Sequence, residues 1–405
     1  MKIVIYTLSF APLIGGEETH LQALVQGVAA RLAARSPQAG SLTLVTPTPG
    51  DGFDDATLPC RVVRRPSLGT LWRLLGEADV VHLSGPVLAL LLLAWLRGKK
   101  VVVRHHVFNA ACPNGLLFYA PERCVCPGHF LAGRYAACLR CNAGRHGWLW
   151  SAVMLLATFP RRWLCRSVAQ NLAVTDYVAQ RVELPGMRTL YPGIPDVPAP
   201  ARNPGNQTQV VRPRSSPFCF GYVGRLVPEK GVAVLFEAAQ ILRETGCDFR
   251  LKLVGDGPAR PELEAQVASR GLAGRVAFTG FLRAEALRRE LEDVQALVMP
   301  SLCAETGGNA AIEQMMRGGL VIASDLAGLA EVVGDAGLKF APGNAAALAE
   351  CMRRAMEQPE FTAELSARAR QRALRLFRQE RMVAECLHIY EQVAKGNPAA
   401  SPGAG

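Results

Sequence analysis

The sequence predicts two α/β domains, each built on a doubly wound parallel β-sheet with helices on both faces. Short apolar runs typical of buried strands alternate with stretches of helical periodicity, and this alternation is typical of parallel sheets. A proline-rich stretch between Pro192 and Pro217 interrupts the alternation, which then restarts. The chain has 405 residues, which is enough for two domains of ordinary size.

The first domain is expected at residues 1–195. It opens with a strand at residues 2–6, a glycine-containing loop at 12–18 and a helix at 20–34. Further strands are expected at residues 42–46, 80–83 and 101–104. The proline-rich stretch, placed at residues 196–217, is then a linker between domains.

The second domain is expected at residues 218–375, and a ligand is expected in the cleft between the two domains. The predicted strands are residues 218–223, 250–254, 276–279 and 296–299. The predicted helices are residues 232–243, 261–270, 284–292 and a helical region at 361–395. We expect the helix at residues 376–395 to pack back on the first domain and the tail at 396–405 to be disordered.

Composition and charge indicate a globular protein with an anionic partner. Half of the residues are hydrophobic and a fifth are charged, which excludes a disordered chain. The net charge of +11 allows nucleic acid, a phosphorylated substrate or an acidic membrane. No secretory signal is recognisable at the start, and the longest apolar run, residues 87–96, is too short to span a bilayer. We interpret that run as a buried helix, with membrane insertion as the alternative.

The most informative stretch, residues 305–313, places two carboxylates around the start of a helix. Glu305 lies on a glycine-rich loop, and Glu313 lies inside the helix that follows. We expect Asn309 to be the N-cap of this helix and residues 310–317 to form it. Its positive end favours an anion, while the carboxylates accept hydrogen bonds from hydroxyls. The stretch therefore predicts a phosphorylated, hydroxyl-rich ligand such as a nucleotide-sugar.

A second charged motif follows the first strand of the second domain. Arg225 offers a bidentate fork and Lys230 a point charge, just before an expected helix. Together they could neutralise a diphosphate without a metal ion. A solvated turn with incidental charges is the alternative. Glycine turns at Gly255 and Gly280 follow further strands, at the edge where open α/β sheets bind ligands.

The order of these parts resembles the GT4 family of retaining glycosyltransferases, which have the GT-B fold of two Rossmann-like domains facing across a cleft. The resemblance covers the chain up to about residue 391 and is most specific over residues 218–340. The motifs that carry it are Gly15-Gly16, Gly224-Arg225, Glu229-Lys230-Gly231, Gly255-Asp256-Gly257-Pro258, Phe278-Thr279-Gly280 and the pair Glu305 and Glu313.

The resemblance implies a role for each matching residue. Arg225 and Lys230 would hold the diphosphate of a nucleoside-diphosphate sugar, Glu305 the transferred sugar and Glu313 the ribose. The backbone around Phe281 would meet the base. The implied catalytic residues are His106, Arg225, Lys230 and Glu305. The implied donor-binding residues are Gly15, Gly16, Gly224, Arg225, Lys230, Gly255, Phe281, Glu305, Gly307, Gly308, Asn309 and Glu313.

The implied reaction is sugar transfer with retention of configuration and with no cofactor required for catalysis. We assign no covalent nucleophile, and Glu305 is interpreted as a positioning group, not as a glycosidase-type acid or base. The first-domain histidine of the family matches His106, although the neighbouring His105 is the alternative, and either could be a core histidine. The acidic residue of the family's Asn-Gly-Ile-Asp turn is displaced to Asp196, so we give Asp196 no role.

Five of the twelve cysteines lie close together in the sequence and predict a structural zinc site. Thiolates at such spacings could complete a tetrahedral site that folds an insertion at residues 109–145. An iron–sulfur cluster and reduced thiols without metal are the alternatives. A similar set occurs in some GT4 members. The candidate ligands are Cys112, Cys124, Cys126, Cys138 and Cys141.

A basic stretch follows the cysteines. Residues 123–175 contain seven arginines and no Asp or Glu, and they include Trp148, Trp150, Phe159 and Trp163. Basic and aromatic residues together suit a segment that lies on an anionic membrane. The alternative is a core helix with a solvated basic face.

The first prediction for function is therefore a glycosyltransferase (EC 2.4) acting on a polysaccharide or lipid-linked acceptor in cell-envelope or exopolysaccharide biosynthesis. The runner-up enzymes are other GT-B types, a phosphorylase or a sugar-nucleotide epimerase. A basic, zinc-containing nucleic-acid-binding protein is the alternative from another class, although no nucleic acid is expected as a partner. We expect a cytoplasmic protein, peripheral on the inner face of the plasma membrane.

Overall fold

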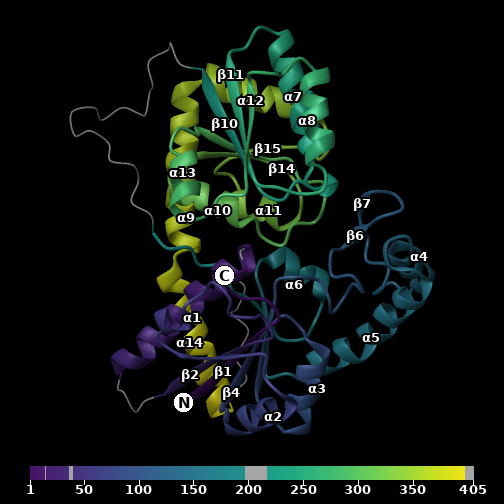
Figure 1. Cartoon of the computed structure of the whole chain (residues 1–405), viewed down its shortest axis with the longest axis vertical. Coiled ribbons are helices and arrows are strands. Elements are labelled where there is room, and N and C mark those ends of the chain that lie inside the picture. Colours follow the sequence, from purple (N-terminus) through teal and green to yellow (C-terminus); the bar gives the residue numbers. More distant parts are fainter. Residues whose placement is uncertain (14, 36–39, 197–216, 397–405) are drawn as a thin grey trace. The chain divides into compact units, whose positions relative to one another are not determined.

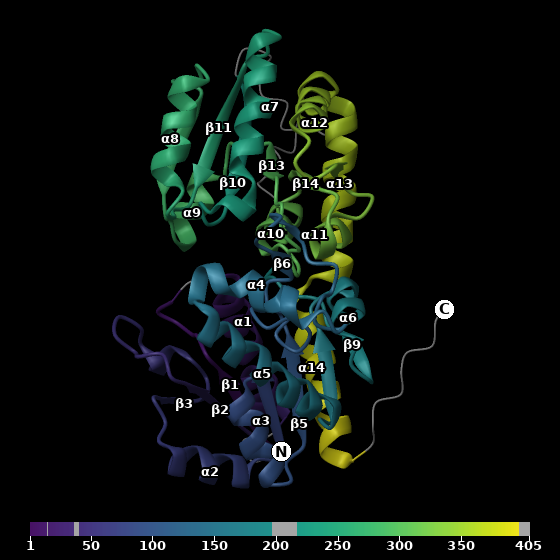
Figure 2. The same ribbon diagram turned by 90° about the vertical axis from the view of Figure 1, so that its right-hand side faces the viewer.

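The computed structural model describes residues 1–13, 15–35, 40–196 and 217–396. The chain divides into two compact units, which are described separately below (Figures 1 and 2). Unit 1 comprises Met1–Pro195 with Phe377–Gly405, and unit 2 comprises Asp196–Leu376. Apart from their end residues, the predicted linker at 196–217 and the predicted disordered tail at 396–405 lie outside the described residues.

Unit 1 is built on a seven-stranded sheet in which every pairing is parallel. Ile5 lies at its centre, opposite Leu44 on one side and His82 on the other. The central strands are almost fully buried because helices cover both faces. In spatial order the strands are β3 (Arg61–Arg64), β2 (Ser41–Thr46), β1 (Lys2–Thr7), β4 (Val80–Ser84), β5 (Val101–His105), β8 (Gln170–Ala173) and β9 (Met187–Thr189).

The last helix of the chain, α14 (Gln379–Lys395), belongs to unit 1. It packs against α1 (Gly16–Arg35) so closely that a Cβ on Gly27 would lie 2.4 Å from the side chain of Val383. Tyr390 of α14 donates to Nδ1 of the buried His82 at 2.9 Å if that nitrogen is unprotonated. The other elements of unit 1 are η1 (Asp55–Thr57), α2 (Leu68–Glu77), α3 (Leu88–Leu96), β6 (Phe118–Tyr119), β7 (Cys124–Val125), α4 (Tyr135–His146), α5 (Trp148–Arg166) and α6 (Asp176–Val182).

Unit 2 repeats the architecture with a six-stranded parallel sheet. In spatial order its strands are β12 (Val276–Gly280), β11 (Phe249–Val254), β10 (Phe218–Val223), β13 (Ala296–Met299), β14 (Leu320–Ser324) and β15 (Leu338–Phe340). Its helices are η2 (Pro228–Lys230), α7 (Val232–Glu244), α8 (Arg260–Ser269), α9 (Ala284–Glu290), α10 (Asn309–Met316), α11 (Ala327–Val333), α12 (Ala345–Glu357) and α13 (Pro359–Leu376).

Two Rossmann-like parallel-sheet units confirm the predicted fold class, and three details of the prediction are wrong. Helix α1 begins at Gly16, inside the predicted loop. The helical region predicted at 361–395 divides after Leu376, and α14, which begins at Gln379, corresponds to the separate helix expected at 376–395. Asn309 is the first residue of α10, and its N-cap is Gly308, whose φ of 92° suits glycine. Helix α3 is buried on one face only, because Leu92, Trp95 and Leu96 are exposed.

Within the described part of the chain, no helix combines the length and the hydrophobicity that a membrane span requires.

Candidate functional site

The candidate residues of unit 2 lie where its parallel strands end. Gly224 and Arg225 follow β10, Gly255 follows β11, and Phe281 follows β12. The segment that carries Glu305 follows β13, which lies next to β10 in the sheet. The carboxyl edge of an open parallel sheet is where such folds bind ligands, so the fold places these residues along one ligand-binding edge.

At this edge, Lys230 and Glu305 form an ion pair. The ammonium Nζ lies 3.0 Å from Oε1 of the carboxylate, and both side chains are largely buried. The hydroxyl of Ser301 also donates to Glu305. Burial alone would lower the pKa of Lys230, but the charge of Glu305 raises it overall. A fixed cation and a fixed hydrogen-bond acceptor therefore share one place, as a ligand with both phosphate and hydroxyl groups requires.

Two glycines allow the loops of this edge to approach one another. A Cβ on Gly231 would lie 1.9 Å from the carbonyl oxygen of Pro300, and the backbone there has a φ of 70°. A Cβ on Gly255 would lie 1.9 Å from the carbonyl oxygen of Gly224. Leu302 N–H also donates to the Glu229 carbonyl at 2.9 Å. The backbone around Lys230 is thus held against the segment that leads to Glu305.

Arg225 and Phe281 both have exposed side chains. The Arg225 carbonyl accepts a hydrogen bond of 2.8 Å from the hydroxyl of the buried Tyr222, which fixes the backbone while the guanidinium stays accessible. The charge of Arg225 acts on Lys230, opposing the rise in its pKa. Phe281 is 51% exposed, and the guanidinium of Arg283 lies 5.7 Å from its ring centroid.

Helix α10 carries the remaining donor-site candidates. Gly308 precedes it and Asn309 begins it, so its first backbone N–H groups point toward the segment of Gly307. Glu313 lies in the second turn and is partly buried, which raises the pKa of its carboxyl against the opposing charge of Arg317. Gly328 lets the next helix, α11, approach: its Cβ would lie 2.4 Å from the Thr306 carbonyl oxygen.

The candidate residues of unit 1 lie at the carboxyl edge of its own sheet. Gly15 and Gly16 follow β1 and lead into α1, whose N-terminus can bind an anion. His106 follows β5, and Gly85, after β4, allows its ring to come close: a Cβ there would lie 3.3 Å from Cε1 of His106. Strands β1, β4 and β5 are neighbours, so these residues meet at one place.

Glu17 is the centre of this place. Its carboxylate accepts a 2.8 Å hydrogen bond from the fully buried Arg104 and another from Ser84, and it lies 3.4 Å from Nδ1 of His106. Burial would raise the pKa of Glu17, but the charges of His106 and Arg104 lower it far below its usual range. Burial lowers the pKa of His106, and Glu17 opposes that effect.

The two neighbouring histidines differ in their surroundings. His105 is fully buried at the end of β5, where Nε2 lies 2.9 Å from the Asn171 side-chain oxygen, and burial lowers its pKa to about 4. His106 lies one residue later, is partly exposed and contacts Glu17. A core histidine and an accessible histidine therefore stand side by side, and His106 is the accessible one.

Sequence reasoning missed Glu17, Ser84 and Arg104. Glu17 and Arg104 adjoin predicted site residues in the chain, but neither type is rare at a surface. Arg104 lies inside a run of residues typical of a buried strand. Because a buried charge needs a partner, this arginine could have indicated that an acidic side chain lies near it.

Four of the five predicted zinc ligands converge. Burial and the neighbouring thiols of Cys112, Cys126 and Cys141 raise the pKa of Cys138 to about 12. Cys112 donates to Asn114 at 3.1 Å, and Asn114 donates to Cys141 at 3.7 Å. Cys124 lies at the margin of this group, because its thiol interacts with Cys126 and Cys141 but not with Cys138, and it donates to Glu122 at 3.9 Å. All twelve cysteines are free.

The metal site itself stays a prediction. In the described ranges, no three His, Cys, Asp or Glu side chains are arranged to hold a metal ion. Because four of the thiols nevertheless gather in one place, the donor set is chemically suited to zinc.

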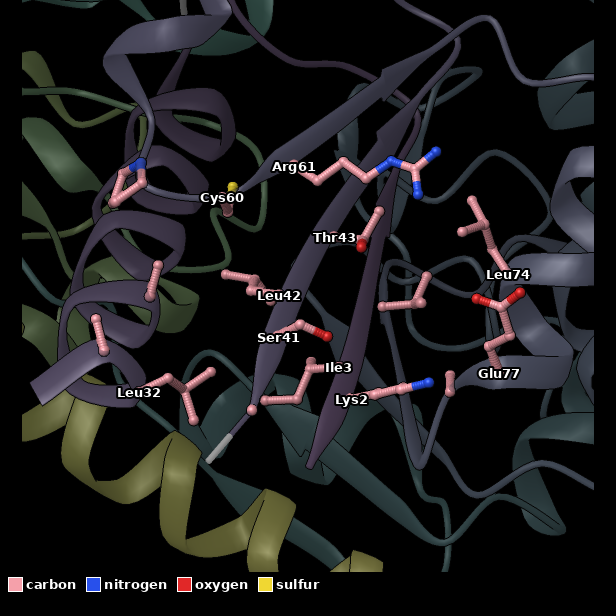
Figure 3. A pocket seen from close by; sticks show the side chains of 16 residues that line it. Lys2, Ile3, Leu32, Ser41, Leu42, Thr43, Cys60, Arg61, Leu74 and Glu77 are labelled. Carbon is pink, nitrogen blue, oxygen red and sulfur yellow. The ribbon is translucent and has the colours of Figure 1, made fainter. Parts of the chain in front are cut away.

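A cavity of about 460 Å³ lies elsewhere in unit 1 (Figure 3). It is lined by the first residues of β1 and β2, by Leu32 of α1 and by Leu74 and Glu77 of α2. These are the amino ends of the strands, opposite the edge that carries Glu17 and His106. The cavity therefore contributes nothing to the candidate site.

Comparison with known families identifies unit 2. Residues 217–358 match the family described as "Glycosyl transferases group 1". Unit 2 carries a group 1 glycosyltransferase domain. The matched residues include Arg225, Lys230, Glu305 and Glu313, so the edge described above belongs to the group 1 glycosyltransferase domain.

Similar curated proteins are named as glycosyltransferases. The chain is 34% identical over 224 residues to "2-deoxystreptamine glucosyltransferase" of Streptomyces kanamyceticus, covering 52% of this chain and 58% of that protein. It is 33% identical over 150 residues to "Alpha-D-kanosaminyltransferase" of the same organism, covering 36% and 39%. The chain thus spans between 39% and 58% of the length of these two relatives.

Solved structures with the same fold cover nearly the whole chain. "Sucrose-phosphate synthase (tll1590) from Thermosynechococcus elongatus" matches with a TM-score of 0.70 at 19% identity, covering 98% of this chain and 100% of that one. HepE from Anabaena in complex with UDP and glucose matches with a TM-score of 0.66 at 20% identity, covering 97% and 100%. The predicted GT-B fold is confirmed, and the cleft between its domains stays a prediction.

Proposed function

We propose that the whole chain is a retaining glycosyltransferase of the GT4 type, with a nucleoside-diphosphate sugar as donor. The Lys230–Glu305 pair carries this proposal, because it sets a cation for phosphate beside an acceptor for sugar hydroxyls at the carboxyl edge of a group 1 domain. Arg225 supplies a second, accessible cation next to it. The pair also distinguishes this function from nucleic-acid binding, which does not require a buried carboxylate beside the lysine.

The mechanism follows from where charge develops. When the sugar leaves, negative charge grows on the departing diphosphate, and Arg225, Lys230 and the N-terminus of α10 stabilise it without rearranging. Glu305 positions the sugar by accepting hydrogen bonds from its hydroxyls, and Glu313 accepts hydrogen bonds from the ribose. His106, held beside Glu17 in unit 1, would have the role of the family's first-domain histidine. No covalent nucleophile is needed if the acceptor attacks the same face of a short-lived ion pair.

A UDP-sugar is the first donor to test, since the structurally similar HepE was solved with UDP and with UDP-glucose. In a thermal-shift panel of UDP-, GDP- and ADP-sugars, one donor class should raise the melting temperature by mass action. The Lys230→Gln variant should lose that shift. Lys252→Gln is the matched control, since Lys252 also pairs with carboxylates of unit 2, at 2.9 Å, but lies inside β11.

Two results would contradict the proposal. The first is a panel in which no nucleotide-sugar shifts the wild-type protein. The second is a Glu305→Ala variant that transfers sugar at the wild-type rate, because Glu305 would then have no part in the site.

For the acceptor, we propose a glycan or lipid-linked molecule of cell-envelope or exopolysaccharide biosynthesis, met at the inner face of the plasma membrane. The basic, acid-poor stretch of unit 1 supports this class. The names of two curated relatives favour a second candidate, a 2-deoxystreptamine-type aminocyclitol. Transfer assays with the identified donor, offering membrane lipid extract or 2-deoxystreptamine, separate the two.

We also propose a structural zinc ion held by Cys112, Cys126, Cys138 and Cys141. The mutual interactions of these four thiols support it, and Cys126 is chosen over Cys124 because Cys126 also interacts with Cys112 and Cys138. Protein purified under reducing conditions should contain about one zinc per chain, and Cys138→Ser should lower that content while Cys124→Ser should not. Purified protein that contains no metal, and is as stable as protein supplied with zinc, would overturn the proposal. Bound iron would overturn it in favour of an iron–sulfur cluster.

A further inference from the structure

Helix α5 has apolar side chains on its exposed side as well as on its buried side, where Leu155, Leu164 and Cys165 lie with Ser151 and Thr158. Ser151 and Thr158 are fully buried, and their hydroxyls bond to the carbonyls of Leu139 and Met154, each at 2.8 Å. On the opposite side, Leu149, Leu156 and Trp163 are 83%, 66% and 56% exposed. A surface helix of a globular protein normally has charged and polar residues on its solvent side. The exposed apolar face therefore needs a partner.

Helix α3 extends this face, and Figures 1 and 2 both show it beside α5. The rings of Trp95 on α3 and Trp163 on α5 are in edge contact, with centroids 5.7 Å apart. Leu92 and Leu96 lie on the same exposed side of α3 as Trp95. We call the combined surface the docking face; it consists of Leu92, Trp95, Leu96, Leu149, Leu156 and Trp163.

The chain segment that contains the docking face is nearly free of acidic residues. Between Val80 and Thr175 the only acidic residue is Glu122, which lies on neither α3 nor α5. Arg145 precedes α5 and Arg166 ends it, and both side chains are exposed. An apolar centre that contains tryptophans and is bordered by arginines matches the acyl boundary and the phosphates of an anionic bilayer.

We propose that the docking face seats unit 1 on the surface of an anionic lipid bilayer. Leu149, Leu156 and the other aliphatic side chains enter the acyl boundary, Trp95 and Trp163 lie at headgroup level, and Arg145 and Arg166 contact lipid phosphates. The protein is held at the surface and does not span the membrane. This inference deepens the proposed function, because it states which surface would bring the enzyme to a lipid-linked acceptor.

Vesicle flotation of the full chain tests the inference, and it needs neither donor nor acceptor. The wild-type protein should float with vesicles that contain phosphatidylglycerol and bind pure phosphatidylcholine much less. The Leu149→Gln/Leu156→Gln variant should bind at least tenfold more weakly, because two exposed leucines no longer enter the apolar layer. Ile241→Gln is the control for the loss of an exposed apolar residue, on α7 of unit 2, and should bind like the wild type.

The charge contribution is tested separately. Arg145→Gln/Arg166→Gln should weaken binding to anionic vesicles by about fivefold per arginine, and added salt should remove the difference. The control variant Arg250→Gln/Arg375→Gln loses the same net charge from exposed positions of unit 2. It should bind anionic vesicles as strongly as the wild type.

Three outcomes would overturn the inference. They are a wild-type protein that floats with neither vesicle type, binding that the leucine variant retains, and a dimer in solution that the leucine variant dissociates. The third would assign the face to a second copy of the chain. None of these outcomes depends on the proposed sugar transfer. If a nucleotide-sugar still raised the melting temperature of a protein that did not float with vesicles, the proposed function would stand without this inference.

Discussion

One buried carboxylate, Glu17, connects three strands of unit 1 at the residue scale. It belongs to the first turn of α1, after β1, and it bonds to Ser84 of β4 and Arg104 of β5. Arg104 has no access to water, so its charge depends on this carboxylate. The same carboxylate faces His106. Glu17 thus stabilises unit 1 and sets the position of the histidine.

Replacing Glu17 with glutamine should therefore destabilise unit 1 strongly. Glu17→Gln keeps the shape but leaves the buried guanidinium of Arg104 without an anion, which costs about 3 kcal/mol. Urea unfolding followed by hydrogen exchange in β1, β4 and β5 measures this loss. Glu18→Gln is the neighbouring control, since the ion pair of Arg104 is with Glu17, whereas the charge of Glu18 acts on His106. Equal losses for the two variants would contradict the assigned role.

Buried histidines should make the protein less stable in acid. Burial lowers the pKa of His82 to about 3 and of His105 to about 4, so the unfolded chain binds protons more readily than the folded one. Stability is then fully present above pH 6.5 and falls as the pH drops toward 4, by up to about 3 kcal/mol for His105.

The change of melting temperature with pH checks this prediction. His105→Gln should flatten the dependence between pH 6.5 and 4, and the exposed His146→Gln should leave it unchanged. A melting temperature independent of pH over this window would show that His105 is protonated in the folded state.

Residue-level prediction worked best where a residue type has few structural uses. Glycines that precede helices, with charged groups after them, led to the edge where Lys230 and Glu305 lie in unit 2. The Lys230–Glu305 contact itself was not predicted, because it depends on how two loops that are distant in sequence pack. Glu17 and Arg104 were missed for the same reason.

At the scale of elements, the loop that carries Lys230 depends on Gly231. A side chain there would require a positive φ and would meet the Pro300 carbonyl at 1.9 Å, so Gly231→Ala should displace the loop from the segment of Glu305. We expect a loss of more than about 2 kcal/mol in stability and of the thermal shift with nucleotide-sugar.

Gly246 provides the matched control for that substitution. Its φ is 79°, but nothing lies within 4 Å of its Cβ position. Gly246→Ala should therefore cost only the backbone strain, about 1 kcal/mol, and should bind donor normally. If the two variants lost equal stability and both kept the donor shift, close approach at Gly231 would not matter to the site.

The strands that were predicted end within one residue of the observed ones, but β3, β8, β9, β14 and β15 were not predicted, and the helices also show where local patterns fail. Runs such as β10 and β13 are buried on both faces, so their apolar residues are continuous and their ends are marked by turns. Helix α5 cannot be oriented from its pattern, because it has apolar residues on both its buried and its exposed sides, and periodicity does not state which side meets the core.

For the whole molecule, the order of elements was sufficient to predict two parallel-sheet units, because alternating strands and helices allow few other folds. The helix expected at residues 376–395, and expected to pack on the first domain, corresponds to α14, which belongs to unit 1. Its buried side chains, among them Met382, Leu387 and Tyr390, join the core formed by β1 and α1. An amphipathic stripe of this kind would fit either unit, and only packing against Gly27 decides.

Deletion of residues 377–405 should therefore unfold unit 1 and spare unit 2. The deletion removes α14 and opens a core that includes Ile5, Leu24 and Val28, whereas unit 2 ends at Leu376 with its own core complete. Burial of several large side chains contributes about 1.5–3 kcal/mol each, which exceeds the stability of an ordinary domain when all are lost together. Limited proteolysis should cut throughout residues 1–195 and leave a fragment of residues 217–376.

Deletion of residues 397–405 alone is the matched control, because α14 ends at Lys395, and it should leave both units resistant. If unit 1 stayed resistant without α14, or if unit 2 were digested with it, the division of the chain into these two units would not describe how it folds.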